Sequence, residues 1–146
     1  MSGAAVGKVI FDISLSLDGF MTAANRRPEE PMGDGGPRLV EWAFGDDERD
    51  RTILTDGIAS IGAVIAGRRT RAAAGEKGVT VMGGAQTGQQ FLAAGLVDEL
   101  SLHVVPVLFG PGTRMFENLG DTHIALEPLA AIQTPRATHL RLRIAR

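Results

Sequence analysis

The chain has 146 residues, a formal net charge of −2 and no cysteine. This length suits one domain with a substantial core, and the lack of cysteine excludes disulfides, zinc–thiolate sites and thiol nucleophiles. The sequence has no basic block, no signal-peptide pattern and no apolar run of about 18 residues. We therefore expect no nucleic-acid partner, no membrane span and a cytoplasmic location.

The first predicted element is a strand over residues 8–17. Apolar and polar residues alternate there, which is the period of a strand with one buried face. Asp18-Gly19 follows as a turn, and residues 24–37 form a long loop rich in proline and glycine. Residues 1–7 are expected to be flexible, so the domain is predicted to span residues 8–146.

A helix is predicted next, from a cap at Asp46 or Asp47 to about Ser60. Its inward-facing residues are expected to be Ile53, Leu54, Ile58 and Ile61.

A short apolar strand over residues 63–66 runs directly into Gly67-Arg68-Arg69-Thr70. Guanidinium groups match phosphate oxygens in geometry and charge, so Arg68 and Arg69 are candidates for binding a phosphate. The alternative is that these two arginines begin a solvated helix.

A second glycine turn lies within Val79-Thr80-Val81-Met82-Gly83-Gly84-Ala85-Gln86. The β-branched residues predict a strand, and a helix-compatible stretch follows over residues 86–94. Paired glycines let a backbone approach a ligand, and a helix N-terminus favours phosphate, so this turn is a candidate cradle for a nucleotide diphosphate. Close packing of strand on helix is the alternative, because the spacing is not that of the dinucleotide-fold fingerprint.

The longest apolar run, residues 100–109, predicts a central or near-central strand that Pro106 interrupts. Two closing antiparallel strands are expected around residues 124–126 and 140–144. Strands that alternate with helices and then close antiparallel predict an α/β fold with a mixed sheet. Ligands bind beyond the carboxyl ends of the strands in open α/β sheets, where Asp18-Gly19 and both glycine turns are expected.

Few other side chains are candidates for catalysis, metal binding or substrate binding. Asp18 is the candidate catalytic carboxylate, with an ordinary Asp-Gly turn as the alternative, and Asp12 is expected on the polar face of its strand. The histidines, His103, His123 and His139, are predicted not to cluster and to form no metal site. Trp42 either borders a substrate pocket or packs in the core.

Five segments, in this order along the chain, resemble the dihydrofolate-reductase-like family that includes the reductase domain of the bacterial riboflavin-synthesis deaminase–reductase, the RibD C-terminal domain. They are Ser16-Leu17-Asp18-Gly19-Phe20, Ala66-Gly67-Arg68-Arg69-Thr70, Val81-Met82-Gly83-Gly84-Ala85, Val97-Asp98-Glu99-Leu100 and the long loop between the first two. The likeness covers residues 8–143 and is greatest to the stand-alone branch of the family.

The resemblance implies a dihydrofolate-reductase-like fold: a mixed, mostly parallel sheet flanked by helices, with antiparallel C-terminal strands. It also implies NADPH as hydride donor and a homodimer. The residues that it assigns to the cofactor phosphates are Gly67, Arg68, Arg69, Thr70, Gly83, Gly84, Ala85 and Gln86. Those that it places beside nicotinamide and substrate are Asp18, Gly19 and Met82.

Two departures from the family pattern stand out. Met82 occupies the position of a glutamate that contacts the pyrimidine in riboflavin-pathway reductases, so a hydrogen-bond acceptor and a charge are lost. A strand–helix stretch is also missing between Thr70 and Arg71. Either residues 67–78 are a shortened crossover, or a segment is absent from this sequence; the second is favoured, because loss of internal strands would expose unpaired sheet edges.

The features together predict an NADPH-dependent reductase of a small heterocycle, a pteridine or a ribosylaminopyrimidine-like compound. The nearest activity would be that of the riboflavin-pathway 5-amino-6-(5-phosphoribosylamino)uracil reductase. The alternative is a non-catalytic dimeric protein that binds a nucleotide or another small molecule on the same fold.

Overall fold

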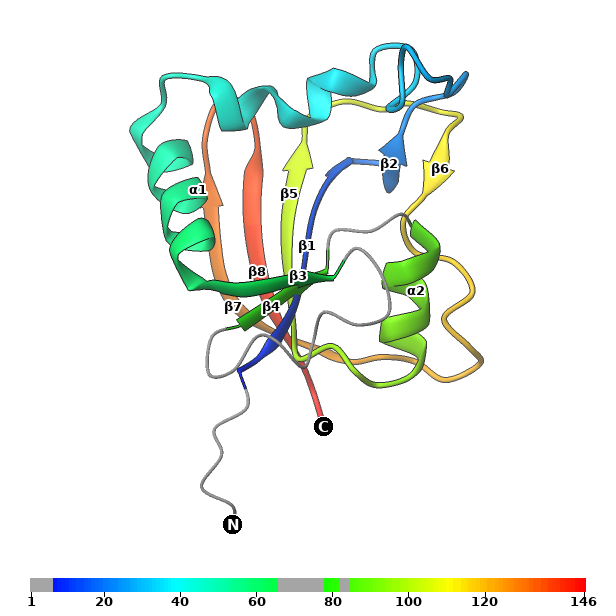
Figure 1. The fold of residues 1–146 in the computed structure, drawn as a ribbon, viewed down its shortest axis with the longest axis vertical. Coiled ribbons are helices and arrows are strands. Elements are labelled where there is room, and N and C mark those ends of the chain that lie inside the picture. Colours follow the sequence, from blue (N-terminus) through cyan, green and yellow to red (C-terminus); the bar gives the residue numbers. More distant parts are fainter. Residues whose placement is uncertain (1–6, 66–77, 82–84) are drawn as a thin grey trace.

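The structure is a computed structural model that describes residues 7–65, 78–81 and 85–146 (Figure 1). Its strands and helices, in chain order, are β1 (Val9–Ser16), β2 (Phe20–Thr22), the 3₁₀ helix η1 (Gly36–Phe44), α1 (Glu48–Ser60), β3 (Ile61–Ile65), β4 (Gly78–Val81), α2 (Ala85–Ala93), β5 (Glu99–Val105), β6 (Thr113–Arg114), β7 (Leu126–Gln133) and β8 (Thr138–Ile144).

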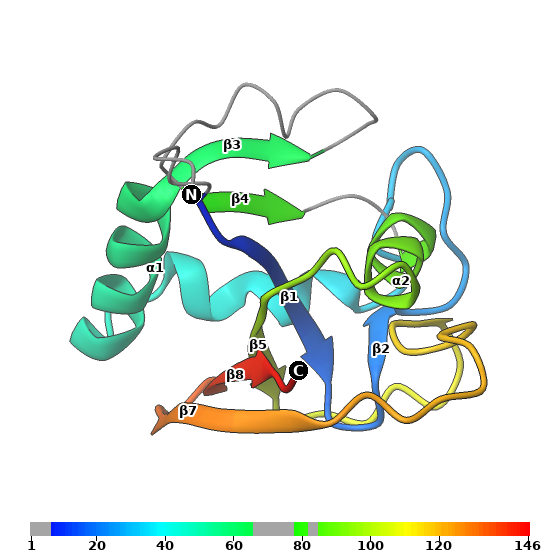
Figure 2. The same cartoon turned by 90° about the horizontal axis from the view of Figure 1, so that it is seen from below.

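Six of the strands form one mixed sheet in the order β3-β4-β1-β5-β8-β7, which confirms the predicted fold class. The first four are parallel, whereas β8 pairs antiparallel with β5 and with β7. Figure 2 shows α1 and α2 on opposite sides of this twisted sheet. None of the helices in the described ranges combines the length and apolar character that a membrane span requires.

The alternation along β1 separates two environments. Val9, Phe11 and Leu15 point to one face and form the main core with Leu92 of α2 and Leu100 of β5. The opposite face carries polar residues of β1 and is covered by η1 and α1, where Leu39 and Trp42 form a smaller apolar cluster. The prediction of a strand with one buried face is therefore correct, although η1 and α1 also partly cover its polar face.

The predicted helices and strands are found with shifted ends. A 3₁₀ helix, η1, was not predicted; it begins with Pro37 in its first turn. The strand expected over residues 100–109 ends at Val105, because Pro106 has no N–H to donate to a neighbouring strand. Asp47 does cap α1, since its Oδ1 accepts the backbone N–H groups of Arg49 and Asp50 at 2.9 and 3.3 Å.

The inward face of α1 differs from the prediction. Ile53 and Leu54 are half-buried, but the Ile58 side chain is 62% exposed and Ile61 belongs to β3. The stripe that begins at Asp50 continues through Ile53 and Leu54 to Gly57, and Ile58 lies one position further round the helix. The prediction for the Thr70–Arg71 junction lies outside the described residues.

Gly88 permits the close approach of α2 to β1 and provides a test of this packing. A Cβ atom at Gly88 would overlap the ring of Phe11, which is fully buried and cannot move aside. We expect Gly88→Ala to lower the free energy of unfolding by about 1–3 kcal/mol, although alanine favours helix more than glycine. Urea unfolding followed by circular dichroism measures the change.

Gly57→Ala in α1 is the matched control, because nothing lies within 4 Å of a Cβ at that position. It should leave stability unchanged or raise it by up to about 1 kcal/mol. Equal effects of the two substitutions would contradict the packing of α2 on Phe11.

Candidate active site

The turn after β1 is held together by Asp18. Its Oδ1 accepts hydrogen bonds from the Ser16 hydroxyl at 2.5 Å and the Phe109 backbone N–H at 3.1 Å, and its Oδ2 accepts the Gly110 N–H at 2.8 Å. Gly19 has a φ of 89°, a conformation that favours glycine. Asp18 thus joins the β1–β2 turn to the turn that follows β5.

These hydrogen bonds determine the charge of Asp18. The Ser16 hydroxyl and the two backbone N–H groups stabilise the carboxylate and lower its pKa to about 2, against a smaller opposing effect of desolvation. Asp18 is therefore ionised at neutral pH and acts as a hydrogen-bond acceptor. An ionised carboxylate can orient a ligand, but it has no proton to donate.

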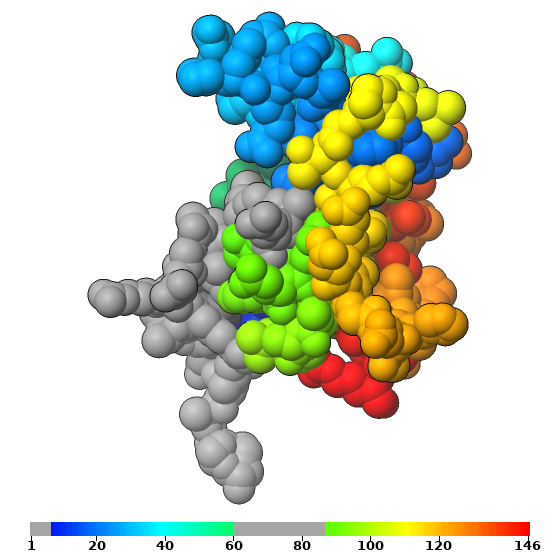
Figure 3. Space-filling view, turned by 90° about the vertical axis from the view of Figure 1, so that its right-hand side faces the viewer, coloured from blue at the N-terminus to red at the C-terminus, as the bar shows by residue number. Residues whose placement is uncertain are grey.

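A hollow of about 370 Å³ lies beside this turn. It is lined by Leu15, Leu17, Asp18, Gly19, Arg114 and Phe116. The Arg114 guanidinium lies over the Phe20 ring, 4.9 Å from the ring centroid, so the hollow combines apolar walls with a carboxylate and a cation. Figure 3 shows that residues 106–120, in yellow, run alongside α2 on this side of the molecule.

Of the predicted site residues, Asp18 and Gly19 come together at this hollow, whereas Trp42 does not line it. Trp42 is 5% exposed, and its indole N–H donates to the Ser14 hydroxyl at 3.0 Å on the opposite face of β1. Ala85 and Gln86 form the start of α2. The remaining predicted residues lie outside the described ones: Gly67, Arg68, Arg69, Thr70, Met82, Gly83 and Gly84.

The prediction that the histidines do not cluster is wrong. His103 of β5 and His139 of β8 are directly opposite in the antiparallel register, and their Nδ1 atoms are 2.7 Å apart. His103 Nε2 lies 2.9 Å from Asp12 Oδ1, and His139 Nε2 lies 2.7 Å from Asp50 Oδ1. The pairing register, which decides this contact, cannot be read from the separate strands.

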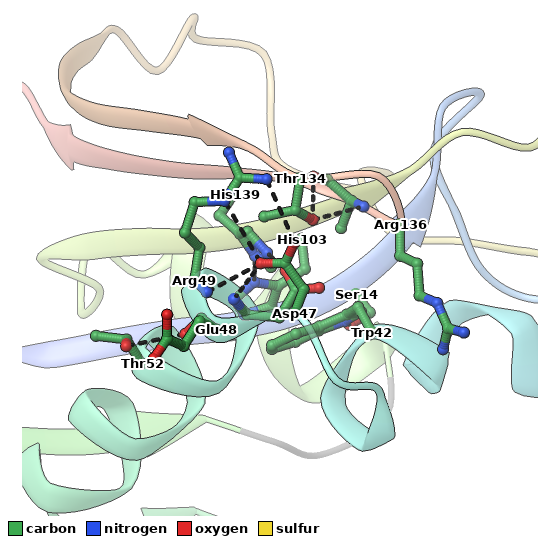
Figure 4. A network of polar contacts seen from close by, with 12 residues as sticks. Ser14, Trp42, Asp47, Glu48, Arg49, Thr52, His103, Thr134, Arg136 and His139 are labelled. Carbon is green, nitrogen blue, oxygen red and sulfur yellow. Dashed lines mark hydrogen bonds and ion pairs between the residues drawn. The ribbon is translucent and has the colours of Figure 1, made fainter.

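Trp42 completes this buried cluster (Figure 4). Its ring centroid lies 4.3 Å from that of His103 and 4.7 Å from that of His139. Burial lowers the pKa of His139, the hydrogen bond to the Asp50 carboxylate opposes this shift, and the charge of His103 adds a smaller lowering. Among the residues that the structure describes, no group of three or more histidine or acidic side chains has the arrangement of a metal site.

The comparisons with known proteins confirm the resemblance. Residues 71–140 match the family model of the RibD C-terminal domain. No curated protein matches the sequence.

Solved structures share the fold at low sequence identity. A putative riboflavin biosynthesis protein from Shewanella sp. PV-4 has a TM-score of 0.54 at 15% identity, over 95% of this chain and 99% of its own. The Thermotoga maritima diaminohydroxyphosphoribosylaminopyrimidine deaminase/5-amino-6-(5-phosphoribosylamino)uracil reductase has a TM-score of 0.62 at 10% identity, over 95% of this chain and 57% of its own.

A dihydrofolate reductase is also similar. The Enterococcus faecalis enzyme, in complex with NADP(H), has a TM-score of 0.54 at 10% identity, and the match covers 98% of this chain and 99% of that one. The fold of this chain is therefore dihydrofolate-reductase-like.

Acid stability tests the bonds of Asp18. Because its pKa is about 2 in the folded chain and near 3.8 when unperturbed, its bonds stabilise the fold above about pH 4, and this contribution disappears as the pH falls toward 2. We expect Asp18→Asn to be less stable than the wild type at pH 6, with a difference that shrinks at pH 4 and again at pH 2.5. Urea unfolding at the three pH values measures this difference, and a constant difference would contradict the assignment.

Proposed function

We propose that this chain is an NADPH-dependent reductase of a small heterocyclic substrate. The observation that carries the proposal is the match of residues 71–140 to the RibD C-terminal domain family, a family of reductases, on a dihydrofolate-reductase-like fold. The matched segment includes the Gly83-Gly84 pair. One similar structure of the same fold is a complex with NADP(H), which supports the choice of cofactor.

The ends of the described elements fit a cofactor diphosphate. β4 ends at Val81 and α2 begins at Ala85, so few residues separate the carboxyl end of a parallel strand from a helix N-terminus. The first N–H groups of α2 have no acceptor within their own helix and favour an anion. In the proposal, Gly83, Gly84, Ala85 and Gln86 bind the diphosphate, and Gly67, Arg68, Arg69 and Thr70 bind the 2′-phosphate end.

The hollow beside Asp18 would hold the reacting ring. NADPH, when bound, supplies the hydride, so the protein needs no nucleophile and contributes position and charge. Leu15, Leu17 and Phe116 provide apolar walls, and the ionised Asp18 carboxylate can accept a hydrogen bond from a ring N–H. These groups fit a flat heterocycle of the pteridine or aminopyrimidine class, with Gly19 and Met82 at its border.

We also propose that the chain forms a homodimer through β7. This strand is at the edge of the sheet, and all eight of its residues are exposed. Leu129 and Ile132 are 42% and 40% exposed. An edge strand with exposed apolar side chains and unpaired backbone groups favours pairing with a second chain.

The cofactor is tested by titrating the protein with NADPH and NADH, followed by calorimetry and by the fluorescence of Trp42, the single tryptophan. We expect NADPH to bind more tightly than NADH. The double variant Arg68→Ala/Arg69→Ala should lose about tenfold or more in NADPH affinity, while its NADH affinity changes little. Arg26→Ala, in the 24–37 loop, is the control and should bind both as the wild type does.

Turnover is then measured with a panel of pteridines and ribosylaminopyrimidines by the loss of NADPH absorbance. Oxidation of NADPH with one class supports the reductase. Failure to bind either nicotinamide cofactor would overturn the cofactor assignment, and tight binding with no turnover on the whole panel would favour a binding protein.

The dimer is tested by light scattering after gel filtration. We expect a dimer for the wild type and a monomer for Leu129→Lys/Ile132→Lys, because two charges on each paired edge repel. Leu108→Lys is the control, since Leu108 is 69% exposed away from β7. A wild-type monomer, or a dimer that survives the β7 changes, would contradict the proposed interface.

A further inference from the structure

Four titratable side chains from four different elements form one continuous hydrogen-bonded chain. In order they are Asp12 of β1, His103 of β5, His139 of β8 and Asp50 of α1, joined by contacts of 2.9, 2.7 and 2.7 Å. The Asp12 side chain is 37% exposed, whereas His103 and His139 are 3% and 5% exposed and Asp50 is fully buried. The chain therefore runs from a partly exposed carboxylate to a buried one, and Figure 4 shows the two imidazoles in the middle of it.

The number of protons on this chain follows from its geometry. Each of the three contacts needs one hydrogen between its two heavy atoms, and the four groups offer no other donor. One proton lies between Asp12 and His103, one between the two Nδ1 atoms, and one between His139 and Asp50. Three protons on two carboxylates and two imidazoles give a total charge of −1.

With both carboxylates ionised, a different number of protons leaves at least one of the three contacts without a single bridging hydrogen. With one proton fewer, both rings are neutral: if each donates from Nε2 to its aspartate, two Nδ1 lone pairs face each other at 2.7 Å, and in any other tautomer a ring lone pair faces a carboxylate. With one proton more, both rings are imidazolium and two N–H groups collide. Since three protons place one hydrogen in each of the three short contacts, the geometry favours a state in which His103 and His139 share one proton.

The burial of Asp50 independently favours the third proton. Asp50 Oδ2 is buried and has no hydrogen-bond partner among the described residues. With two neutral rings the cluster would have a charge of −2, part of it on this unsolvated carboxylate, and an uncompensated buried charge is strongly unfavourable. The positive charge that the shared proton brings is delocalised over the imidazole that Asp50 contacts and compensates this charge.

We propose that Asp12, His103, His139 and Asp50 act as a proton-sharing clamp, a pH-sensitive device that takes up one proton when the chain folds and holds α1 on the sheet. The proposal is independent of the reductase activity. Across residues 48–59 of α1, Asp50 is the one side chain that is fully buried. The clamp therefore holds this helix together with the half-buried Ile53 and Leu54, and opening it loosens α1.

The other charged groups around the clamp are already paired. Asp47 of α1 pairs with Arg49, and Arg141, the next residue of β8 on the same face, pairs with Glu99. The η1 helix contributes the uncharged Trp42. Besides the mutual interaction of the two imidazoles, the charges that act on His139 are those of Asp50 and Asp12, both of which favour its protonated form.

The test is the free energy of unfolding from pH 5 to pH 9. Unfolded histidines have a pKa near 6.5, so above about pH 7 the unfolded pair has two ring protons and the folded clamp has three. Folding then takes up one proton, and the folding constant should fall by up to tenfold per pH unit until the clamp loses that proton. Below about pH 6 both unfolded rings are imidazolium and carry four ring protons together, one more than the folded clamp. Stability should therefore fall again as the pH is lowered, as the lowered pKa of His139 also predicts.

An ordinary pair of buried neutral histidines predicts a different curve. Such a pair has two ring protons in both the folded and unfolded chains above pH 7, so stability would not change between pH 7 and pH 8.5. This flat result, or a stability that rises with pH across this range, would overturn the proposal. The chain has three histidines and no cysteine, so few other groups titrate there.

His139→Gln removes the shared proton and is expected to abolish the fall in stability between pH 7 and pH 8.5. His123→Gln is the matched control, because His123 is exposed and outside the cluster; it should behave as the wild type. Asp12→Asn is a milder variant at the exposed end of the clamp, and it should lose the proton at a lower pH than the wild type.

If His139→Gln does not fold, the wild type still decides the question through ¹⁵N spectra of its histidine rings. We expect both Nε2 atoms of the pair to be protonated at pH 7.5, with both Nδ1 signals between those of bare and protonated nitrogen. Two bare Nδ1 signals would overturn the proposal. Trp42 fluorescence gives a second signal, because it contacts both rings and should change at the pH where the shared proton is lost.

Discussion

The arrangement of the whole molecule depends on β1, which pairs in parallel with β4 on one side and β5 on the other. A strand in the middle of a sheet presents every second residue to each face. On one face Phe11 and Leu15 fix the main core and, through the gap at Gly88, the position of α2. On the other face Asp12 and Ser14 meet His103 and Trp42. One alternating strand therefore determines both the apolar packing and the polar cluster.

The carboxyl end of the same strand builds the candidate active site. Ser16 ends β1 with a buried hydroxyl that donates to Asp18 and accepts the backbone N–H of Phe20 at 3.0 Å. Asp18 in turn binds the backbone at residues 109 and 110, beyond the end of β5. Two parallel neighbours are thus tied together where ligands bind in α/β sheets. These hydrogen bonds keep Asp18 ionised and hold the residues around the hollow beside Gly19 in place.

The sequence predicted those features that arise from local patterns. The alternation of β1, the capping by Asp47, the apolar run of β5 and the presence of β4 and α2 all follow from residues that are close in the chain. The register between β5 and β8 does not, because either strand could shift by two residues and keep the same faces buried. His103 and His139 meet through that register, and Asp50 reaches His139 across 89 residues of sequence. For the same reason the sequence could not show whether Trp42 is buried at this cluster or borders the substrate pocket.

The polar cluster is an unusual way to fix a helix, and its energetics explain what it contributes. Apolar residues of similar volume would pack this face of the sheet with equal or greater stability, because burying charged groups is costly. They would not distinguish one position of α1 from another, since apolar contacts are not directional. A chain of three hydrogen bonds between four elements does distinguish them, because each donor has one acceptor within reach. Removing any one member leaves a buried polar group of its neighbour unpaired, so the position of α1 and the protonation of the imidazole pair are parts of the same equilibrium.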